Sequence, residues 1–227
     1  MASFWGDSLM TQRLLVALAV VFLAGFAGLL AFLVHALEAG QAQHLFSEAG
    51  WFERTTPVLW LFLAAVLLFA RPVALAHRLA MAVIAVALAA REEGWHKKFT
   101  ADSLFKTDYY QMDSVPLAEH LVAGAVAAGL TFLLLWVLFV GARQLFARGG
   151  WRRPWGWTAM LGLALSPALK VVDRGPALLR QHFDLVVPAN ADLALKAVEE
   201  GFEWALPLIF LLALALFATD RHERPVG

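Results

Sequence analysis

Six apolar segments dominate the chain, and the lengths of their uncharged runs constrain its fold most strongly. The first run, from Leu14 to Val34, has 21 residues. At 1.5 Å per residue this is enough to cross the roughly 30 Å hydrocarbon core of a bilayer. Four other segments have uncharged runs that are too short to do so. If they cross a membrane, they must bring ionisable side chains to membrane depth, where such groups are costly and usually functional.

The composition favours an integral membrane protein. The chain is 61% hydrophobic and only 16% charged, whereas soluble domains are roughly 45–50% apolar and about 25% charged. The formal net charge is zero, which argues against a basic surface for nucleic acid. The absence of cysteine excludes disulfides, thiolate metal sites and cysteine nucleophiles. The first apolar run is also longer than the roughly 7–15-residue core of a signal peptide, so we expect it to be a transmembrane helix.

We predict an all-α protein in which residues 1–227 form a single domain, one bundle of six transmembrane helices. The helices pair as three hairpins, with the longer loops on the outer side. The predicted spans lie near residues 13–37, 55–71, 75–98, 117–142, 155–174 and 198–219. Pro116 and Pro176 fit helix boundaries, and Pro167 is expected to kink the fifth span.

The loop charges predict the orientation. Two connections carry basic residues and no acid, and the first is the turn of residues 71–78 with Arg71 and Arg78. The loop of residues 143–153 has four arginines, whereas the other connections are acidic or mixed. Because cytoplasmic loops are enriched in Lys and Arg, both termini are expected on the cytoplasmic side of a bacterial inner membrane.

Three of the short segments gather their ionisable residues at the predicted outer face. The third segment is uncharged over only 12 residues, and the fifth and sixth over 16 each. A full span in each case must include charged residues near its outer end. These residues are Glu92, Glu93, His96, Lys170, Asp173, Arg174, Glu199, Glu200 and Glu203.

Helical spacing allows these side chains to act together. Glu199 and Glu203 are four residues apart, which places them on one helix face, and Glu92 and His96 have the same spacing. Across the three segments the six acids exceed the four bases, Arg91, Lys97, Lys170 and Arg174, by two. The surplus carboxylates must hold protons or bind a cation. The sequence Glu93-Gly94-Trp95-His96 also has the Glu-x-x-His spacing of carboxylate-bridged di-metal bundles.

Several functions agree with this pattern. The polar residues can form a structural ion-pair network in a scaffold or in a subunit of a larger complex. They can hold a divalent metal, the candidate cofactor, which would activate water for hydrolysis of a lipid-type substrate. A proton- or ion-coupled transporter is a third alternative. Motifs for a P-loop, a dinucleotide site, a serine hydrolase or an H-E-x-x-H metalloprotease are absent from the sequence.

Two short motifs resemble those of a known group of proteins. They are the stretch Arg91-Glu92-Glu93-Gly94-Trp95-His96-Lys97 and the acidic residues Glu199, Glu200 and Glu203. The group consists of uncharacterised bacterial inner-membrane proteins with an acidic-Trp stretch after a short span and a second acidic cluster near the C-terminus. The resemblance covers about a tenth of the chain and implies a bacterial, polytopic protein without implying an activity.

The working hypothesis is therefore a polytopic membrane protein with an acid-rich cavity at its outer face. Its metal or cation ligands would come from Glu92, Glu93, His96, Glu199, Glu200 and Glu203, and its counter-charges from Lys170, Asp173 and Arg174. Glu92, His96 and Glu203 are the candidates for acid–base catalysis. The expected partners are the lipid bilayer and a membrane protein or a second copy of the chain.

Overall fold

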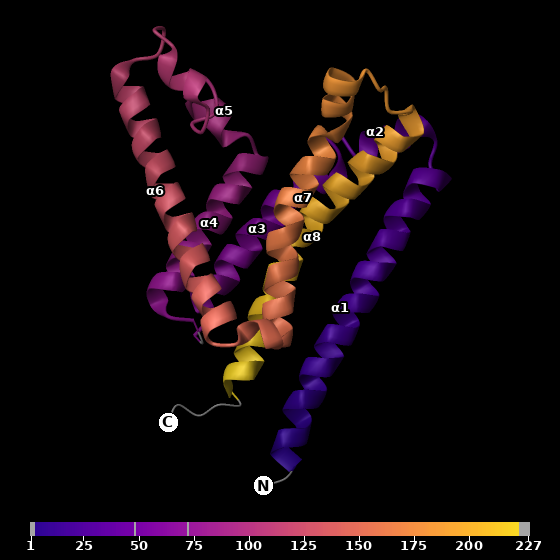
Figure 1. The fold of residues 1–227 in the computed structure, drawn as a ribbon, viewed down its shortest axis with the longest axis vertical. Coiled ribbons are helices and arrows are strands. Elements are labelled where there is room, and N and C mark those ends of the chain that lie inside the picture. Colours follow the sequence, from indigo (N-terminus) through magenta and orange to yellow (C-terminus); the bar gives the residue numbers. More distant parts are fainter. Residues whose placement is uncertain (1–2, 48, 72, 223–227) are drawn as a thin grey trace. The chain divides into compact units, whose positions relative to one another are not determined.

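The computed structural model describes residues 3–47, 49–71 and 73–222, and within these ranges it is helical without any strand. The helices in chain order are α1 (Ser3–Ala36), α2 (Ala39–Leu45), α3 (Trp51–Phe69), α4 (Leu75–Glu92), α5 (Trp95–Phe99), η1 (Thr107–Gln111), α6 (Leu117–Ala142), η2 (Arg143–Ala147), η3 (Gly150–Arg152), α7 (Pro154–Phe183) and α8 (Ala189–His222). Figure 1 shows their course. The expected all-helical class is therefore confirmed.

Four helices in the described part are long and apolar enough to cross a membrane. They are Arg13–Ala36, Trp51–Phe69, Leu117–Ala147 and Ala189–Asp220. The other two predicted spans correspond to α4 and α7. Within its 18 residues α4 carries Arg78, Arg91 and Glu92, and α7 contains Lys170 among many small and polar residues. The structure thus supports a multi-pass protein, and the count of six spans stays a prediction.

The predicted ends of the third and fifth spans differ from the structure. The third span was expected to continue to residue 98, but α4 ends at Glu92 and a separate short helix follows. Gly94 between them has φ 64°, in the left-handed region that glycine adopts without strain and that ends α-helices. The fifth span was expected to end before Pro176, but α7 continues through it to Phe183. Its side chains beyond Pro176 are exposed, so water can satisfy the carbonyl that this proline leaves unbonded.

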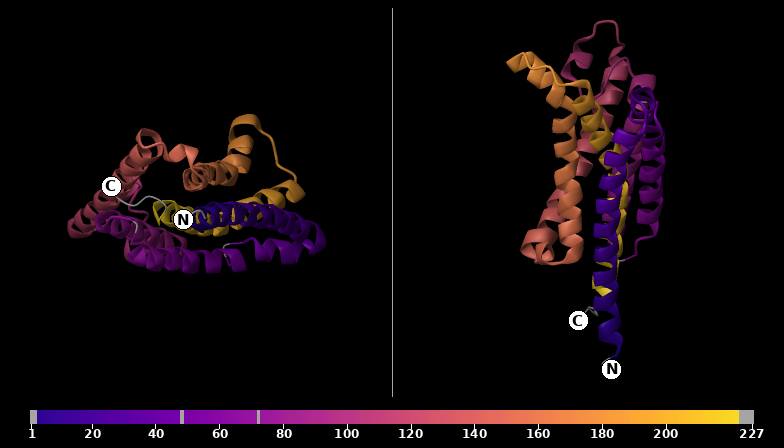
Figure 2. Two further views of the ribbon diagram at one scale, coloured as in Figure 1. Left: turned by 90° about the horizontal axis from the view of Figure 1, so that it is seen from below. Right: turned by 90° about the vertical axis from the view of Figure 1, so that its right-hand side faces the viewer.

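The chain divides into two compact units, residues 1–59 with 149–227, and residues 60–148. In the first unit α7 and α8 form an antiparallel pair (Figure 1), joined by residues 184–188. Helix α1 runs beside α8, as both views in Figure 2 show. The ion pairs Arg153–Asp220 (3.3 Å) and Lys170–Glu203 (2.6 Å) link α7 and α8. The two pairs lie 17 residues apart on each helix, roughly 25 Å along the axes.

The core of the first unit is apolar and aromatic. It contains Phe26 and Leu30 of α1, Phe46 after α2 and Phe52 of α3, with Trp204 of α8 packed against them. The ring centroids of Trp204 and Phe26 are 5.4 Å apart and stacked, and those of Phe46 and Phe52 are also 5.4 Å apart. These contacts bring α1, α3 and α8 together and hold the first turn of α3 against α8.

The second unit contains α4 packed against α6. The segment between α5 and α6 folds over Tyr109, which is fully buried and packs with Val115 and Ala123. The Tyr109 hydroxyl donates a 2.9 Å hydrogen bond to Oε1 of Glu119 in the first turn of α6. The connection between these helices is therefore an ordered cap on the N-terminus of α6.

Tyr109 provides a prediction for this cap. Burial, followed by the hydrogen bond and the negative charge of Glu119, raises the pKa of Tyr109 to about 12, against about 10 for free tyrosine. The folded state gains its full stability from the Tyr109 interactions below about pH 10 and loses it as the pH rises towards 12. The reason is that the unfolded chain releases the Tyr109 hydroxyl proton at a lower pH than the folded chain does. The chain has two tyrosines, so ultraviolet titration of a Tyr110→Phe variant follows Tyr109 alone. Phenolate formation near pH 10 in the folded variant would contradict the buried position, and Glu119→Gln should lower the midpoint.

Candidate functional site

Three helices of the first unit bring ionisable side chains together. Lys170 of α7 faces two glutamates on one side of α8, with its Nζ 2.6 Å from Oε1 of Glu203 and 3.7 Å from Oε1 of Glu199. The glutamates are four residues apart, so a single ammonium group reaches both. The side chains of Glu199 and Glu203 are only 14% exposed, and that of Lys170 is 35% exposed. This is a partly buried ion-pair triad.

Glu200 lies beside this triad but faces a different helix. Successive residues of an α-helix are rotated by roughly 100°, so Glu200 points away from Lys170 and towards α3. Its carboxyl group lies close to the carboxyl group of Glu53 in the first turn of α3. A carboxylate can only accept hydrogen bonds. Two neighbouring carboxyl groups can therefore form a hydrogen bond only when one of them carries a proton.

The acidic cluster, defined as Glu53, Glu199, Glu200 and Glu203 with Lys170, is bounded by Trp204. The indole Nε1 of Trp204 donates a 3.0 Å hydrogen bond to the hydroxyl of Thr55 on α3. The Thr55 hydroxyl also donates to the carbonyl of Trp51, at 2.8 Å. The α3–α8 contact thus combines a hydrogen-bonded indole with a carboxyl pair one helical turn away, and this fixes the position of Glu53 relative to Glu200.

The cluster lies at a defined height on the α7–α8 pair. It is roughly 25 Å along the helices from the Arg153–Asp220 ion pair. This separation is slightly less than the roughly 30 Å hydrocarbon thickness of a bilayer. If Arg153 and Asp220 lie at one membrane interface, the cluster lies near the opposite one.

The remaining predicted site residues have other surroundings. Glu92 is the last residue of α4, and its Oε1 is 3.9 Å from an arginine nitrogen of Arg91. Glu93 is exposed at the C-cap of α4, and the side chain of His96 lies outside the described residues. The break at Gly94 separates Glu93 from His96, so the Glu-x-x-His stretch does not lie on one continuous helix. Asp173 and Arg174 are exposed on α7, but Asp173 lies close enough to the acidic cluster for its charge to act on Glu199.

The predicted residues therefore fall into two groups. Glu92, Glu93 and His96 belong to the unit of residues 60–148, whereas Lys170, Glu199, Glu200 and Glu203 belong to the other. The convergence of the two groups in one cavity stays a prediction. Within the described ranges, no group of three or more His, Asp or Glu side chains has a geometry that could hold a metal ion.

Sequence reasoning missed Glu53 as a member of the cluster. It lies at the start of the second short segment, immediately before Arg54, and was placed just outside the predicted span. The sequence contained a signal for Glu53, because the uncharged run of the second segment is as short as those of the fifth and sixth segments. Trp204, which bounds the cluster, packs against Phe26 and Phe52.

Comparisons with protein-family models, with curated proteins and with solved structures found no match for this chain.

Proposed function

We propose that this protein is a multi-pass membrane protein that binds a cation in the acidic cluster, and that the cation is a proton shared by Glu53 and Glu200. The observation that carries the proposal is the close approach of these two carboxyl groups. Lys170 already neutralises part of the charge of Glu199 and Glu203 through its two ion pairs. The remaining negative charge is concentrated on the Glu53–Glu200 side.

The membrane placement is part of the same proposal. We propose six spans, with α4 and α7 joining the four long apolar helices. In this arrangement the basic loop of residues 143–153 faces the cytoplasm with both termini, and the acidic cluster lies near the periplasmic face of a bacterial inner membrane. The separation of roughly 25 Å between the Arg153–Asp220 pair and the cluster supports their position near opposite membrane interfaces.

The metal-dependent hydrolase of the working hypothesis receives less support. It requires Glu92 and His96 to join the α8 glutamates around one ion, with ligand bonds of about 2 Å. The helix break at Gly94 separates Glu93 from His96. The Lys170 ammonium group also occupies the space between Glu199 and Glu203 that a metal ion would need.

A scaffold or subunit role is the second candidate, and the Lys170 triad favours it. In that case the ion pairs only hold α7 against α8, and a partner chain covers the apolar outer surfaces of the helices. The two roles differ in one respect. Only the cation-binding role requires an exchangeable proton between Glu53 and Glu200.

Salt dependence of thermal unfolding tests the identity of the cation. The purified protein is melted in choline, sodium, potassium, magnesium and calcium chloride at matched ionic strength. A metal ion present at 100 times its dissociation constant stabilises the folded state by about 2.7 kcal/mol, which raises Tm by several degrees. We expect equal Tm values in all five salts because a proton fills the pair. A higher Tm in calcium or magnesium chloride that is absent in the Glu200→Gln variant would show that the site holds a divalent metal ion and not a proton.

A further inference from the structure

A basic and aromatic surface lies in the first unit, at the end of the α7–α8 pair opposite the acidic cluster. Residues 149–157 contain two arginines and three tryptophans and no acid. They form the short helix η3 and the first turn of α7. The segment therefore carries positive charge with no counter-charge of its own.

The two arginines of this segment differ in their partners. Arg153 forms its 3.3 Å ion pair with Asp220, and the Trp155 ring packs edge-on against Phe217 of α8 with centroids 5.1 Å apart. These side chains therefore face α8. Arg152 is exposed, and among the ion pairs between described residues none involves it. Arg152 is thus the arginine of this segment that can attract an anion from outside the chain.

The backbone and an aromatic ring hold Arg152 in place. Gly149 adopts φ 71°, and the turn that it starts is closed by a 3.1 Å hydrogen bond from the Arg152 N–H to the Gly149 carbonyl. The Cζ atom of Arg152 lies 4.8 Å from the centroid of the exposed Trp151 ring, within the roughly 6 Å reach of a cation–π contact. A ring contact of this kind leaves the outer N–H donors of a guanidinium group available to an anion.

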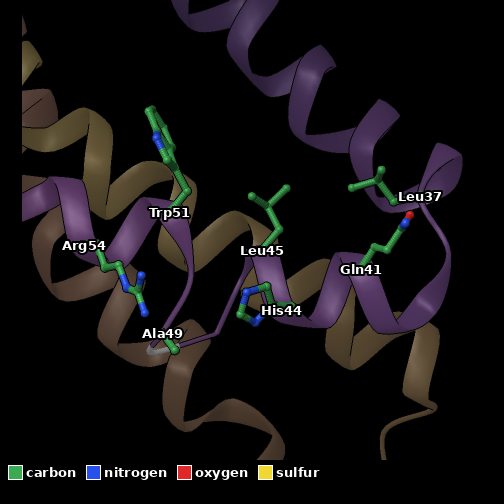
Figure 3. Close-up of a pocket in the computed structure, with 7 residues that line it drawn as sticks. All are labelled: Leu37, Gln41, His44, Leu45, Ala49, Trp51 and Arg54. Carbon is green, nitrogen blue, oxygen red and sulfur yellow. The ribbon is translucent and has the colours of Figure 1, made fainter.

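Arg54 and Trp51, another arginine and tryptophan close in sequence, are arranged differently. Both line a pocket between the end of α1, α2 and the start of α3. Figure 3 shows the Arg54 side chain directed to one side of the chain and the Trp51 ring to the other. A single ligand therefore cannot contact both groups, and Arg54 serves as the matched control for Arg152.

We propose that Arg152 and Trp151 bind the headgroup of an anionic membrane phospholipid, whose phosphate supplies the counter-charge that the segment lacks. The candidate membrane span Leu117–Ala147 ends four residues before Trp151. Lipid headgroups lie at that depth, where tryptophan is enriched and where arginine is attracted to anionic lipids. The proposal rests on the membrane placement proposed above and is independent of the proton in the acidic cluster.

Fluorine NMR of the full chain tests the proposal. The protein is labelled with fluorotryptophan and placed in phosphatidylcholine nanodiscs that contain increasing fractions of phosphatidylglycerol. The resonance that is lost in a Trp151→Phe variant identifies the signal of Trp151. We expect this signal to shift with the phosphatidylglycerol fraction and to reach a plateau. Arg152→Gln should raise the half-saturating fraction roughly fivefold, the contribution of one arginine at an anionic surface.

Two further variants show whether the charge and the position of Arg152 cause this effect. Arg152→Lys should keep part of the affinity for phosphatidylglycerol, because the charge remains but the planar fork of donors is lost. Arg54→Gln removes an exposed arginine that does not lie on its tryptophan and should leave the Trp151 titration unchanged. Circular dichroism and gel filtration check that each variant is folded. A Trp151 signal that ignores phosphatidylglycerol in the native chain would overturn the proposal, and so would an unchanged half-saturating fraction in Arg152→Gln.

A soluble headgroup analogue distinguishes the two sources of the phosphate. Glycerophosphate added to pure phosphatidylcholine nanodiscs should leave the Trp151 signal unchanged, because it is not concentrated at the membrane surface. A shift of this signal at millimolar glycerophosphate would overturn the lipid assignment in favour of a soluble phosphate compound.

A nitroxide on the lipid acyl chain separates this proposal from the membrane placement. It should broaden the signal of Trp157, which is 62% exposed near the start of α7 and is identified with a Trp157→Phe variant. Broadening of Trp157 without a response of Trp151 to phosphatidylglycerol would overturn the lipid proposal alone. A Trp157 signal that is not broadened would contradict the membrane placement and the lipid proposal with it.

Discussion

Lys170→Met is expected to lower the free energy of unfolding by about 2–3 kcal/mol. The substitution removes the ammonium group that contacts Glu203 at 2.6 Å and Glu199 at 3.7 Å, and it leaves two carboxylates without their partner. Removing one member of a fully buried ion pair costs about 3–5 kcal/mol. We expect less because the Lys170 side chain is 35% exposed, so water screens part of the interaction. Denaturant titration of the purified protein in mixed micelles measures the change.

Lys196→Met is the matched control. Lys196 forms an ion pair with Asp192 on the same helix, but both side chains are more exposed, at 58% and 40%. Its loss should cost at most about 0.5 kcal/mol. The double variant Lys170→Met/Glu203→Gln should regain at least about 1 kcal/mol relative to Lys170→Met, since it removes one of the uncompensated charges. Equal losses of unfolding free energy in Lys170→Met and Lys196→Met would show that the triad stabilises the protein no more than an exposed ion pair does.

Trp204→Ala is expected to destabilise the chain by about 3 kcal/mol, the lower end of the range for large buried aromatic side chains, because Trp204 is only partly buried. Trp204 stacks on Phe26 at 5.4 Å and packs against Trp51 and Phe52 at 5.7 and 6.2 Å. The alanine variant loses these ring contacts and the hydrogen bond to Thr55. It should also loosen the first turn of α3, so that Glu53 and Glu200 separate.

Trp204→Phe separates packing from hydrogen bonding. The phenyl ring keeps most of the aromatic contacts but cannot donate to Thr55, so the expected loss is about 1 kcal/mol. The unfolding free energies of the two variants come from the same denaturant titration. A loss of under about 1 kcal/mol for Trp204→Ala would mean that the packing of Trp204 contributes little to the stability of this unit.

The helical class and most helix positions follow from the sequence because lengths and charges limit the choices. Pro116 lies at the N-cap of α6, as predicted, since proline suits the start of a helix. Pro176 did not end α7, because proline removes only its own hydrogen bond and α7 is exposed beyond it. Gly94 ended α4 because it adopts a left-handed conformation, and sequence alone does not distinguish this from a glycine within a helix.

The candidate site was predictable to a similar extent. The spacing of Glu199 and Glu203 predicts one helix face, and the surplus of acids predicts a shared counter-charge or proton. Their contact with Lys170 depends on the register of α7 against α8, which the Arg153–Asp220 pair also reflects. The partnership of Glu53 and Glu200 connects residues 147 positions apart in the chain. Helical periodicity carries no information on contacts of this kind, which arise from the packing of Phe26, Phe52 and Trp204.

Infrared spectroscopy of the carboxyl groups tests the proton between Glu53 and Glu200 most directly. A protonated carboxyl group absorbs in a C=O stretching region that is separate from the carboxylate bands, and the band shifts in deuterium oxide. At neutral pH we expect one such band in the native protein, its loss in both Glu200→Gln and Glu53→Gln, and its retention in the control Asp192→Asn. A spectrum of the native protein with carboxylate bands only, or a protonated band that both glutamine variants keep, would contradict the proposed proton site.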